Sequence, residues 1–265
     1  MQKTKIEWCD MTWNPVTGCL HGCPYCYARG IANRFGGAYD HDLCVNRTYL
    51  THETTAELCR GVISTPMQRA IRKGGRLVMV PAPYPMRFAP TFHAHLLDQP
   101  SKIKKPKNIF VTSMGDLFGD WVPDKWITDV FTAANAAPQH RYLFLTKNGS
   151  RYEQLNLLPD NKKFWYGTTR TGLPKNERGA SDHGNIFLSI EPILAPVDTD
   201  TMNAIELWNW VIVGAETGNR KEKVIPDRNW IMDIKDACRE SGTPLFMKNS
   251  LKRLMGKEFI QEFPW

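Results

Sequence analysis

Three cysteines lie close together near the N-terminus, in the run Gly18-Cys19-Leu20-His21-Gly22-Cys23-Pro24-Tyr25-Cys26-Tyr27. Their spacing is C-x3-C-x2-C, and soft thiolate ligands favour iron–sulfur and zinc sites. A cubane cluster has four irons, so three cysteines would leave one iron free to bind a small molecule. A structural zinc site needs four ligands instead, and Cys9, His21 or Cys44 could supply the fourth. The spacing favours the cluster, because zinc motifs more often contain two cysteine pairs or a cysteine pair followed by a histidine pair.

The composition is typical of one large folded domain. The chain has 265 residues, of which 42% are hydrophobic, so a single domain over residues 1–265 is expected. Residues 1–9 are polar and charged, and no apolar run approaches membrane-spanning length. We therefore expect a soluble cytoplasmic protein with no membrane partner. Seven cysteines, three of them clustered, indicate a reducing compartment rather than a disulfide framework.

Short apolar runs alternate with helical patterns along the chain. Strands are predicted at residues 11–17, 76–81, 108–113, 142–147, 164–168, 186–190, 210–214 and 244–248. Several are continuous apolar runs, which is typical of parallel strands buried on both faces. Helices are predicted at residues 27–35, 54–72, 124–136, 150–157 and 228–241. This alternation predicts an α/β fold, a complete or partial TIM-like (βα) barrel.

In such barrels the chemistry takes place at the carboxyl ends of the strands. Polar or charged residues follow almost every predicted strand, and the charged ones are Asp116, Lys147, Glu191, Glu216 and Lys248. Loops are polar in general, so any one of these residues could simply belong to a loop. Charged groups so close to buried strands are costly unless paired, however, and the set as a whole therefore indicates a site at this rim.

Basic residues also follow the strands: Arg170, Lys175, Arg178, Arg220, Lys221, Lys223, Lys248, Lys252 and Arg253. With the nearby aromatic residues Trp165, Tyr166 and Trp230, this rim could hold a phosphate backbone and stacked bases. The net charge of +7 also favours an anionic partner, whereas interspersed acids weaken the case. Nucleic acid is thus modestly favoured over a small anionic substrate. The lysine-rich run at residues 101–107 precedes a strand and is interpreted as a solvated face away from the site.

The cysteine loop resembles that of the radical S-adenosylmethionine (SAM) enzymes. The chain as a whole is similar to a phage- and prophage-encoded family of radical SAM-like proteins. The matching segments are residues 4–8, 12–19, 109–118, 137–140, 145–147, 189–192, 210–216 and 246–248, which occur in order over nearly the whole length. The resemblance implies a barrel of the radical SAM type, whose usual core has six βα units.

The resemblance also implies two cofactors, a [4Fe–4S] cluster on Cys19, Cys23 and Cys26 and SAM bound at its open iron. An external one-electron reductant of the flavodoxin or ferredoxin type would reduce the cluster. The reduced cluster passes an electron into the sulfonium of SAM, and the carbon–sulfur bond breaks to leave methionine and a 5′-deoxyadenosyl radical. This radical removes hydrogen from the substrate and needs shielding from competing reactions.

Further roles follow from the same resemblance. Many radical SAM enzymes place Gly-Gly-Glu after the second strand to hold the methionine amine, but residues 80–85 lack it. Ser113 and Asp116 are the preferred replacements. Tyr25 is expected beside the cluster, and Thr168, Thr169 and Glu191 are expected to contact the ribose or adenine. The candidates for substrate handling or proton transfer, each equally consistent with a structural ion pair, are Lys147, Glu216 and Lys248.

The leading substrate hypothesis is a modified thymine-type nucleobase in phage DNA, or the free nucleotide, whose side chain would be isomerised or decarboxylated. A base in duplex DNA would have to flip into the barrel mouth. The location would then be the host-cell cytoplasm. The alternatives are a DNA-lesion repair enzyme similar to spore photoproduct lyase, a peptide or metabolite radical enzyme, and a zinc-stabilised nucleic-acid-binding protein without turnover.

Overall fold

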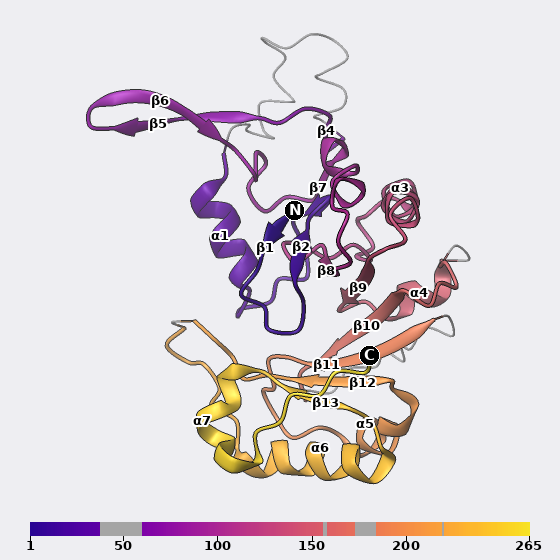
Figure 1. Cartoon of the computed structure of the whole chain (residues 1–265). Helices are drawn as coiled ribbons and strands as arrows, with labels where there is room; N and C mark the ends of the chain where they lie inside the picture. The colour runs from indigo at the N-terminus through magenta and orange to yellow at the C-terminus, as the bar shows by residue number, and fades with distance from the viewer. Residues whose placement is uncertain (38–59, 156–157, 173–183, 219) are drawn as a thin grey trace.

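The centre of the protein is a mostly parallel eight-stranded sheet. The computed structural model describes residues 1–37, 60–155, 158–172, 184–218 and 220–265 (Figure 1). In these residues the sheet has the order β1-β2-β8-β9-β10-β11-β12-β13. β1 is antiparallel to β2, and every other neighbouring pair is parallel. The bounds are β1 (Gln2–Lys3), β2 (Met11–Trp13), β8 (Asn108–Val111), β9 (Arg141–Thr146), β10 (Phe164–Arg170), β11 (Asn185–Ile190), β12 (Trp210–Val213) and β13 (Leu245–Met247).

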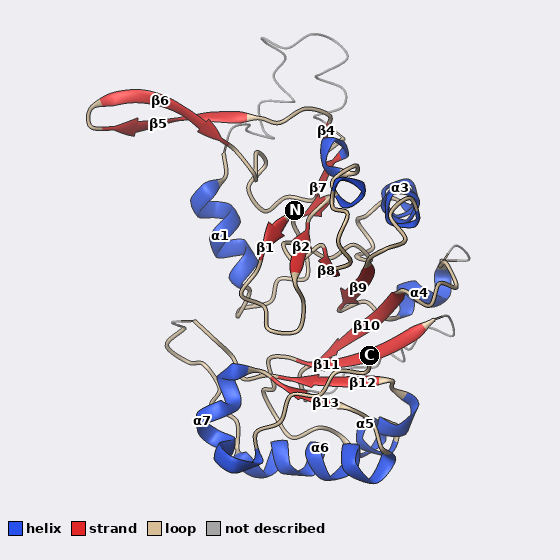
Figure 2. Ribbon diagram, viewed as in Figure 1, coloured by secondary structure: helices blue, strands red, loops and turns tan. Residues whose placement is uncertain are grey.

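Helical segments alternate with these strands (Figure 2). They are α1 (Tyr27–Phe35), η2 (Ala94–Leu96), η3 (Pro100–Lys102), α3 (Asp124–Asn135), α4 (Ser150–Gln154), α5 (Thr199–Asn203), η4 (Ile205–Leu207), α6 (Arg228–Ser241), η5 (Asn249–Leu251), α7 (Lys252–Met255) and η6 (Gly256–Glu258). From β8 to β13 the strands are neighbours in chain order, which confirms the predicted α/β fold and its parallel sheet. None of the described helices is long and apolar enough to cross a membrane.

The two faces of the sheet have different coverings because side chains alternate along each strand. On one face, Ile109 and Val111 of β8 pack with helix α3, and Val211 and Val213 of β12 pack with helix α6. The opposite face carries an aromatic cluster that includes Trp8, Trp210 and residues from β8 to β13. The C-terminal segment closes over this cluster, since Trp265 packs on both Trp165 and Trp210.

The predicted strand at residues 76–81 exists but lies outside the main sheet. β6 (Arg76–Pro81) pairs only with β5 (Gln68–Lys73) among the described strands, in an antiparallel hairpin. The predicted helix at residues 54–72 is wrong where the structure describes it, because this stretch contains β4 (Val62–Ile63) and most of β5. Gly74 and Gly75 both have positive φ, the conformation that a tight hairpin turn requires. Residues 54–59 lie outside the described residues.

Two further predicted elements end earlier than expected. The strand at residues 11–17 is interrupted at Asn14-Pro15, because proline has no N–H to donate to the sheet. The chain then continues as β3 (Val16–Thr17), which joins a small sheet with β7 (Thr91–His93) and β4. The helix predicted at residues 150–157 ends at Gln154 as α4, and residues 156–157 lie outside the described residues.

Candidate functional site

A cavity of about 620 Å³ lies at the carboxyl ends of the parallel strands. Its lining includes all the predicted site residues except Thr168: Cys19, Cys23, Tyr25, Cys26, Ser113, Asp116, Lys147, Thr169, Glu191, Glu216 and Lys248. Thr168 is buried within β10, one residue before Thr169. The structure thus brings together side chains that are more than 200 residues apart in the sequence, as expected where parallel strands end at one edge.

The cysteine loop enters this cavity between β3 and α1. Gly18 has a φ of +84°, and a Cβ at this position would lie 2.2 Å from the Ala89 carbonyl oxygen. Only glycine allows this close approach. At the other end of the loop, Cys26 caps α1, and its Sγ accepts a hydrogen bond from the Arg29 N–H at 3.4 Å. Burial raises the pKa of the Cys19 thiol to about 12, with smaller contributions from Asp116 and the other two thiols.

The three loop cysteines are free thiols that line the same cavity. As they stand, no three His, Cys, Asp or Glu side chains of the described residues form a site that could hold a metal ion. Loading would therefore require side-chain adjustment in the loop. The set of donors, three thiols with no fourth cysteine in the lining, fits a cluster with one open iron. Of the alternative zinc ligands, His21 bonds Asp116, Cys9 is not part of the cavity lining, and Cys44 lies outside the described residues.

Asp116 connects the cysteine loop to the sheet. Its buried carboxylate accepts hydrogen bonds from His21 Nε2 at 2.8 Å, Thr146 Oγ1 at 2.8 Å, and the N–H groups of Phe118 and Lys147 at 3.0 Å. Burial alone would raise the pKa of this carboxyl, but the bonds from His21 and Lys147 hold it below its usual value. With so many donors around it, Asp116 is suited to holding the loop in place rather than to binding a ligand amine.

Three other predicted charged residues, Glu191, Glu216 and Lys248, form ion pairs at the cavity. Lys248 Nζ contacts the Glu191 carboxylate, and Glu7 lies 4.0 Å away from the same ammonium. Glu216 binds the Arg220 guanidinium through two hydrogen bonds of 2.6 and 2.7 Å. The hydrogen bond from Arg220 holds the pKa of Glu216 below its usual value. In this structure Lys248 and Glu216 are therefore members of ion pairs, the alternative that the sequence left open beside substrate handling.

Tyr25 and Ser113 lie on the side of the cavity near the cysteines. The Lys147 ammonium is 5.3 Å from the centroid of the Tyr25 ring, within the range of a cation–π contact. The Ser113 hydroxyl donates to Asn14 Oδ1 at 3.1 Å, and the same oxygen accepts the Met114 N–H at 3.0 Å. Sequence reasoning did not predict Asn14 as a site residue, although it belongs to one of the segments that carry the family resemblance.

The N-terminal residues also line the cavity, and sequence reasoning missed them too. Residues 2–8, from β1 to the following turn, contribute to its wall. Within this turn, Glu7 accepts a hydrogen bond from the Asn249 N–H at 3.0 Å, so the N-terminus is attached to the end of β13. The available signal was the matching segment at residues 4–8, which lies ahead of the first predicted strand.

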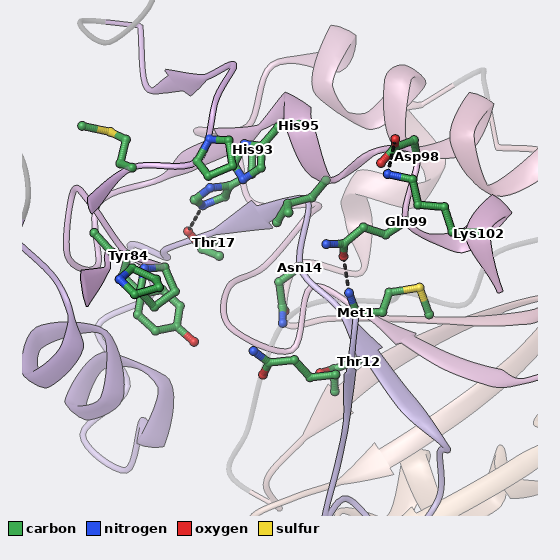
Figure 3. A pocket seen from close by; sticks show the side chains of 17 residues that line it. Met1, Thr12, Asn14, Thr17, Tyr84, His93, His95, Asp98, Gln99 and Lys102 are labelled. Atoms are coloured by element: carbon green, nitrogen blue, oxygen red, sulfur yellow. Dashed lines mark hydrogen bonds and ion pairs between the residues drawn. The ribbon is translucent and has the colours of Figure 1, made fainter. Parts of the chain in front are cut away.

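A second cavity of about 390 Å³ adjoins the first (Figure 3). Both are lined by Gln2, Thr12, Asn14 and Tyr84, so the two spaces meet at β1 and β2. On its far side, His93 Nε2 bonds the Thr17 hydroxyl at 2.9 Å. Burial, with a smaller contribution from His95 nearby, lowers the pKa of His93 to about 4. This histidine is therefore neutral at physiological pH.

The prediction of a basic rim with stacking aromatics is partly wrong. Trp165 and Tyr166 are buried in the two packed faces of the sheet, so neither is available to stack on a base, whereas Trp230 on α6 is partly buried against the core. Of the basic residues, Arg220 and Lys248 are already paired with carboxylates. Lys175 and Arg178 lie outside the described residues. The lysine-rich run at residues 101–107 precedes β8, as predicted, at the end of the strand opposite the site.

Comparison with known proteins places the chain in a family without assigning an activity. A family model described as a protein of unknown function matches residues 3–254, nearly the whole chain. A search of curated proteins found no match, and a search of solved structures found none either.

Proposed function

The chain belongs to the protein family DUF5131, and we propose that it is a radical SAM enzyme. The observation that carries this proposal is the cavity in which three free cysteines meet polar residues at the carboxyl ends of parallel strands. We also propose that the sheet belongs to a complete or partial TIM-like barrel of the radical SAM type. The chain order of β8 to β13, with helices on one face and an aromatic interior on the other, supports this architecture.

In this proposal Cys19, Cys23 and Cys26 hold a [4Fe–4S] cluster, and SAM binds beside it. When bound, these groups supply one-electron cleavage of a carbon–sulfur bond and abstraction of a substrate hydrogen. The protein contributes the position of the loop through Asp116, which holds both His21 and the end of β9. Apolar side chains and the N-terminal residues form part of the wall around the site, where a radical would need shielding.

The polar residues of the cavity divide into two groups around the cysteines. Tyr25 and Ser113 lie nearest to the loop and are suited to the methionine end of SAM, whereas Thr169 and Glu191 come from the neighbouring strands β10 and β11 and are suited to the ribose. Thr168 is buried in β10 directly before Thr169 and does not line the cavity.

Lys147, Glu216 and Lys248 complete the polar lining of the cavity. The Lys147 ammonium lies over Tyr25, so a cation stands beside the cysteine loop, where it can hold an anionic group or move a proton. Lys248 would handle the substrate by exchanging its contact with Glu191 for one with a substrate anion. Glu216 holds Arg220 at the mouth and so positions the surrounding loop.

For the substrate we propose a modified thymine-type nucleobase, in DNA or as a nucleotide, whose side chain is isomerised or decarboxylated. A cavity of about 620 Å³ has the size of sites that enclose a small organic ligand. A net charge of +7 favours a polyanionic partner. If the base is part of a duplex, it must leave the stack to reach a cavity at this depth.

The test is anaerobic purification with iron and sulfide reconstitution, followed by dithionite reduction in the presence of SAM. We expect 5′-deoxyadenosine on chromatography, and none from a variant with Cys19→Ala, Cys23→Ala and Cys26→Ala. The matched control is Cys238→Ala, since Cys238 is buried in α6 away from the cavity. Stoichiometric zinc with no 5′-deoxyadenosine, even with DNA added, would refute the proposal in favour of a metal-stabilised binding protein.

A further inference from the structure

The hairpin of β5 and β6 extends away from the rest of the protein (Figure 1). Its two strands pair with each other over six positions, from Gln68 opposite Pro81 to Lys73 opposite Arg76, and with no other strand of the described residues. An isolated two-stranded hairpin is only marginally stable in water. A partner that binds the arm would therefore stabilise it.

The arm is strongly basic. It carries Arg69, Arg72, Lys73 and Arg76, and the sequence has no Asp or Glu between residues 60 and 97. Lys73 lies directly opposite Arg76 in the ladder, where like charges destabilise the pair of strands. Arg69 donates to the Gly36 carbonyl at 3.1 Å and so belongs to the base of the arm. The other three cations surround the tip, where a polyanion would relieve their repulsion.

One face of the arm is also exposed and partly apolar. Leu77 and Met79 have exposed fractions of 71% and 58%. They share this face with Arg72, because Arg72 is paired with Leu77 and side chains alternate along a strand. Apolar side chains of this size, beside Arg72 on a projecting ribbon, are suited to a surface that offers both charge and apolar edges.

We propose that the β5–β6 hairpin is a DNA-binding arm that enters the major groove of a duplex. The major groove, about 12 Å wide, admits a two-stranded β-ribbon. Six residues per strand span about 20 Å, which is enough to follow the groove past several phosphates. Arg72, Lys73 and Arg76 contact the phosphates, and Leu77 and Met79 meet the apolar edges of the bases, such as thymine methyl groups. The inference rests on the proposed function only in naming DNA rather than another polyanion.

The base of the arm is connected to the candidate site. Tyr84, three residues after β6, lines the main cavity, and its carbonyl accepts the Gly37 N–H at 3.2 Å. Gly37 follows α1, a helix of nine residues that begins directly after Cys26. A helix of this length spans about 14 Å. The base of the arm therefore borders the cavity that would receive a flipped base.

The test compares two variants that each lose three positive charges. The arm variant carries Arg72→Gln, Lys73→Gln and Arg76→Gln. The control carries Lys104→Gln, Lys105→Gln and Lys107→Gln in the lysine-rich run ahead of β8. Binding to a fluorescent 24-base-pair duplex is measured by anisotropy from 50 to 300 mM KCl. Circular dichroism and thermal melting establish that both variants are folded, and Arg72→Lys with Arg76→Lys preserves the charge as a further comparison.

We expect the arm variant to bind on the order of 10²-fold more weakly at 0.1 M salt, with a salt slope reduced by about 2 to 3. The control and the lysine variant should bind within about threefold of the unaltered protein, because phosphate contacts depend mainly on charge. Equal losses in the arm variant and the control would overturn the proposal. So would an arm variant with unchanged duplex binding, or an arm whose loss weakens binding to phosphatidylglycerol vesicles or duplex RNA but not to DNA.

These results are independent of the radical chemistry. DNA binding needs neither a loaded cluster nor SAM, and 5′-deoxyadenosine formation without DNA does not need the arm. A protein that forms 5′-deoxyadenosine but loses no DNA affinity in the arm variant would overturn the arm alone. A protein that binds DNA through the arm but forms no 5′-deoxyadenosine would overturn the enzymatic proposal alone.

Discussion

Replacing Asp116 with asparagine should weaken both the fold and the cysteine loop. The carboxylate accepts hydrogen bonds from His21, Thr146 and the N–H groups of Phe118 and Lys147. Asparagine keeps one acceptor oxygen but replaces the other with an NH₂ group, which donates hydrogen bonds. This NH₂ group would face the Lys147 N–H, another donor, and no hydrogen bond could form between them. A buried donor left without an acceptor costs about 1–3 kcal/mol, and the lost charge-assisted bond from His21 adds to this. We expect a total of about 3 kcal/mol.

The assay is urea unfolding of the metal-free protein together with iron content after reconstitution. A loop no longer held through His21 should retain less iron per folded molecule, a readout that a purely structural role elsewhere would not change. The control is Asp129→Asn, since Asp129 pairs with the exposed Lys125 along α3 and should cost less than about 0.5 kcal/mol. If Asp116→Asn is as stable as the control variant and binds iron normally, the role assigned to Asp116 is wrong.

The same carboxylate predicts a dependence on pH. Its folded pKa is below its ordinary value of 3.8, so the folded protein binds this proton less readily than the unfolded chain does. The stabilisation is present in full above about pH 5 and is lost as the pH falls towards the folded pKa. Asp116→Asn should remove this part of the acid sensitivity, and an unchanged acid profile would contradict the assignment.

Two further perturbations test other parts of the site. His93 has a folded pKa of about 4 against 6.5 for a free histidine, so the unfolded chain binds the proton more tightly. The free energy of unfolding, measured with urea, should therefore fall by about 3 kcal/mol between pH 6.5 and 4. The His93→Gln variant should lose less stability over this range. Gly18→Ala should destabilise the protein by about 2–4 kcal/mol and reduce iron loading, because its Cβ would lie 2.2 Å from the Ala89 carbonyl oxygen at a φ of +84°.

Control variants test whether the close approach at Gly18 and the titration of His93 cause the expected losses of stability. Gly22→Ala has a similar φ of +72° but no atom within 4 Å of the added Cβ, so it should cost only about 1 kcal/mol. A Gly18→Ala variant no less stable than Gly22→Ala would show that the close approach to Ala89 is unimportant. For His93, an acid sensitivity that persists in full after His93→Gln would show that another group is responsible.

Several elements were predictable from the sequence because their local pattern determines them. Continuous apolar runs followed by polar loops correctly indicated β8 to β13, since a strand buried on both faces needs apolar residues at every position. The main cavity was predictable for a related reason. Once the strands are parallel and neighbours in chain order, their carboxyl ends must meet, so Asp116, Lys147 and Glu191 had to lie near one another.

The hairpin shows the limit of the same reasoning. The apolar run of β6 is indistinguishable in sequence from a buried strand, but here it is exposed and pairs only with β5 among the described strands. Whether an apolar strand is covered depends on which other segments reach it, and these are distant in the chain. Trp165 and Tyr166 show the converse, since these aromatics were expected near the rim but are buried within the sheet.

The chemical character of the site is thus determined by the sequence, in the spacing of its three cysteines and in the residue types that follow its strands. The partners of those residues are decided by the tertiary structure. Asp116 binds His21, Lys248 contacts Glu191, and Asn14 supports Ser113 across about a hundred residues of chain. Such pairings depend on side-chain direction and burial, because a partly buried charge is stabilised by an opposite charge or hydrogen-bond partner close in space. The order of residues along the chain does not specify which group that partner is.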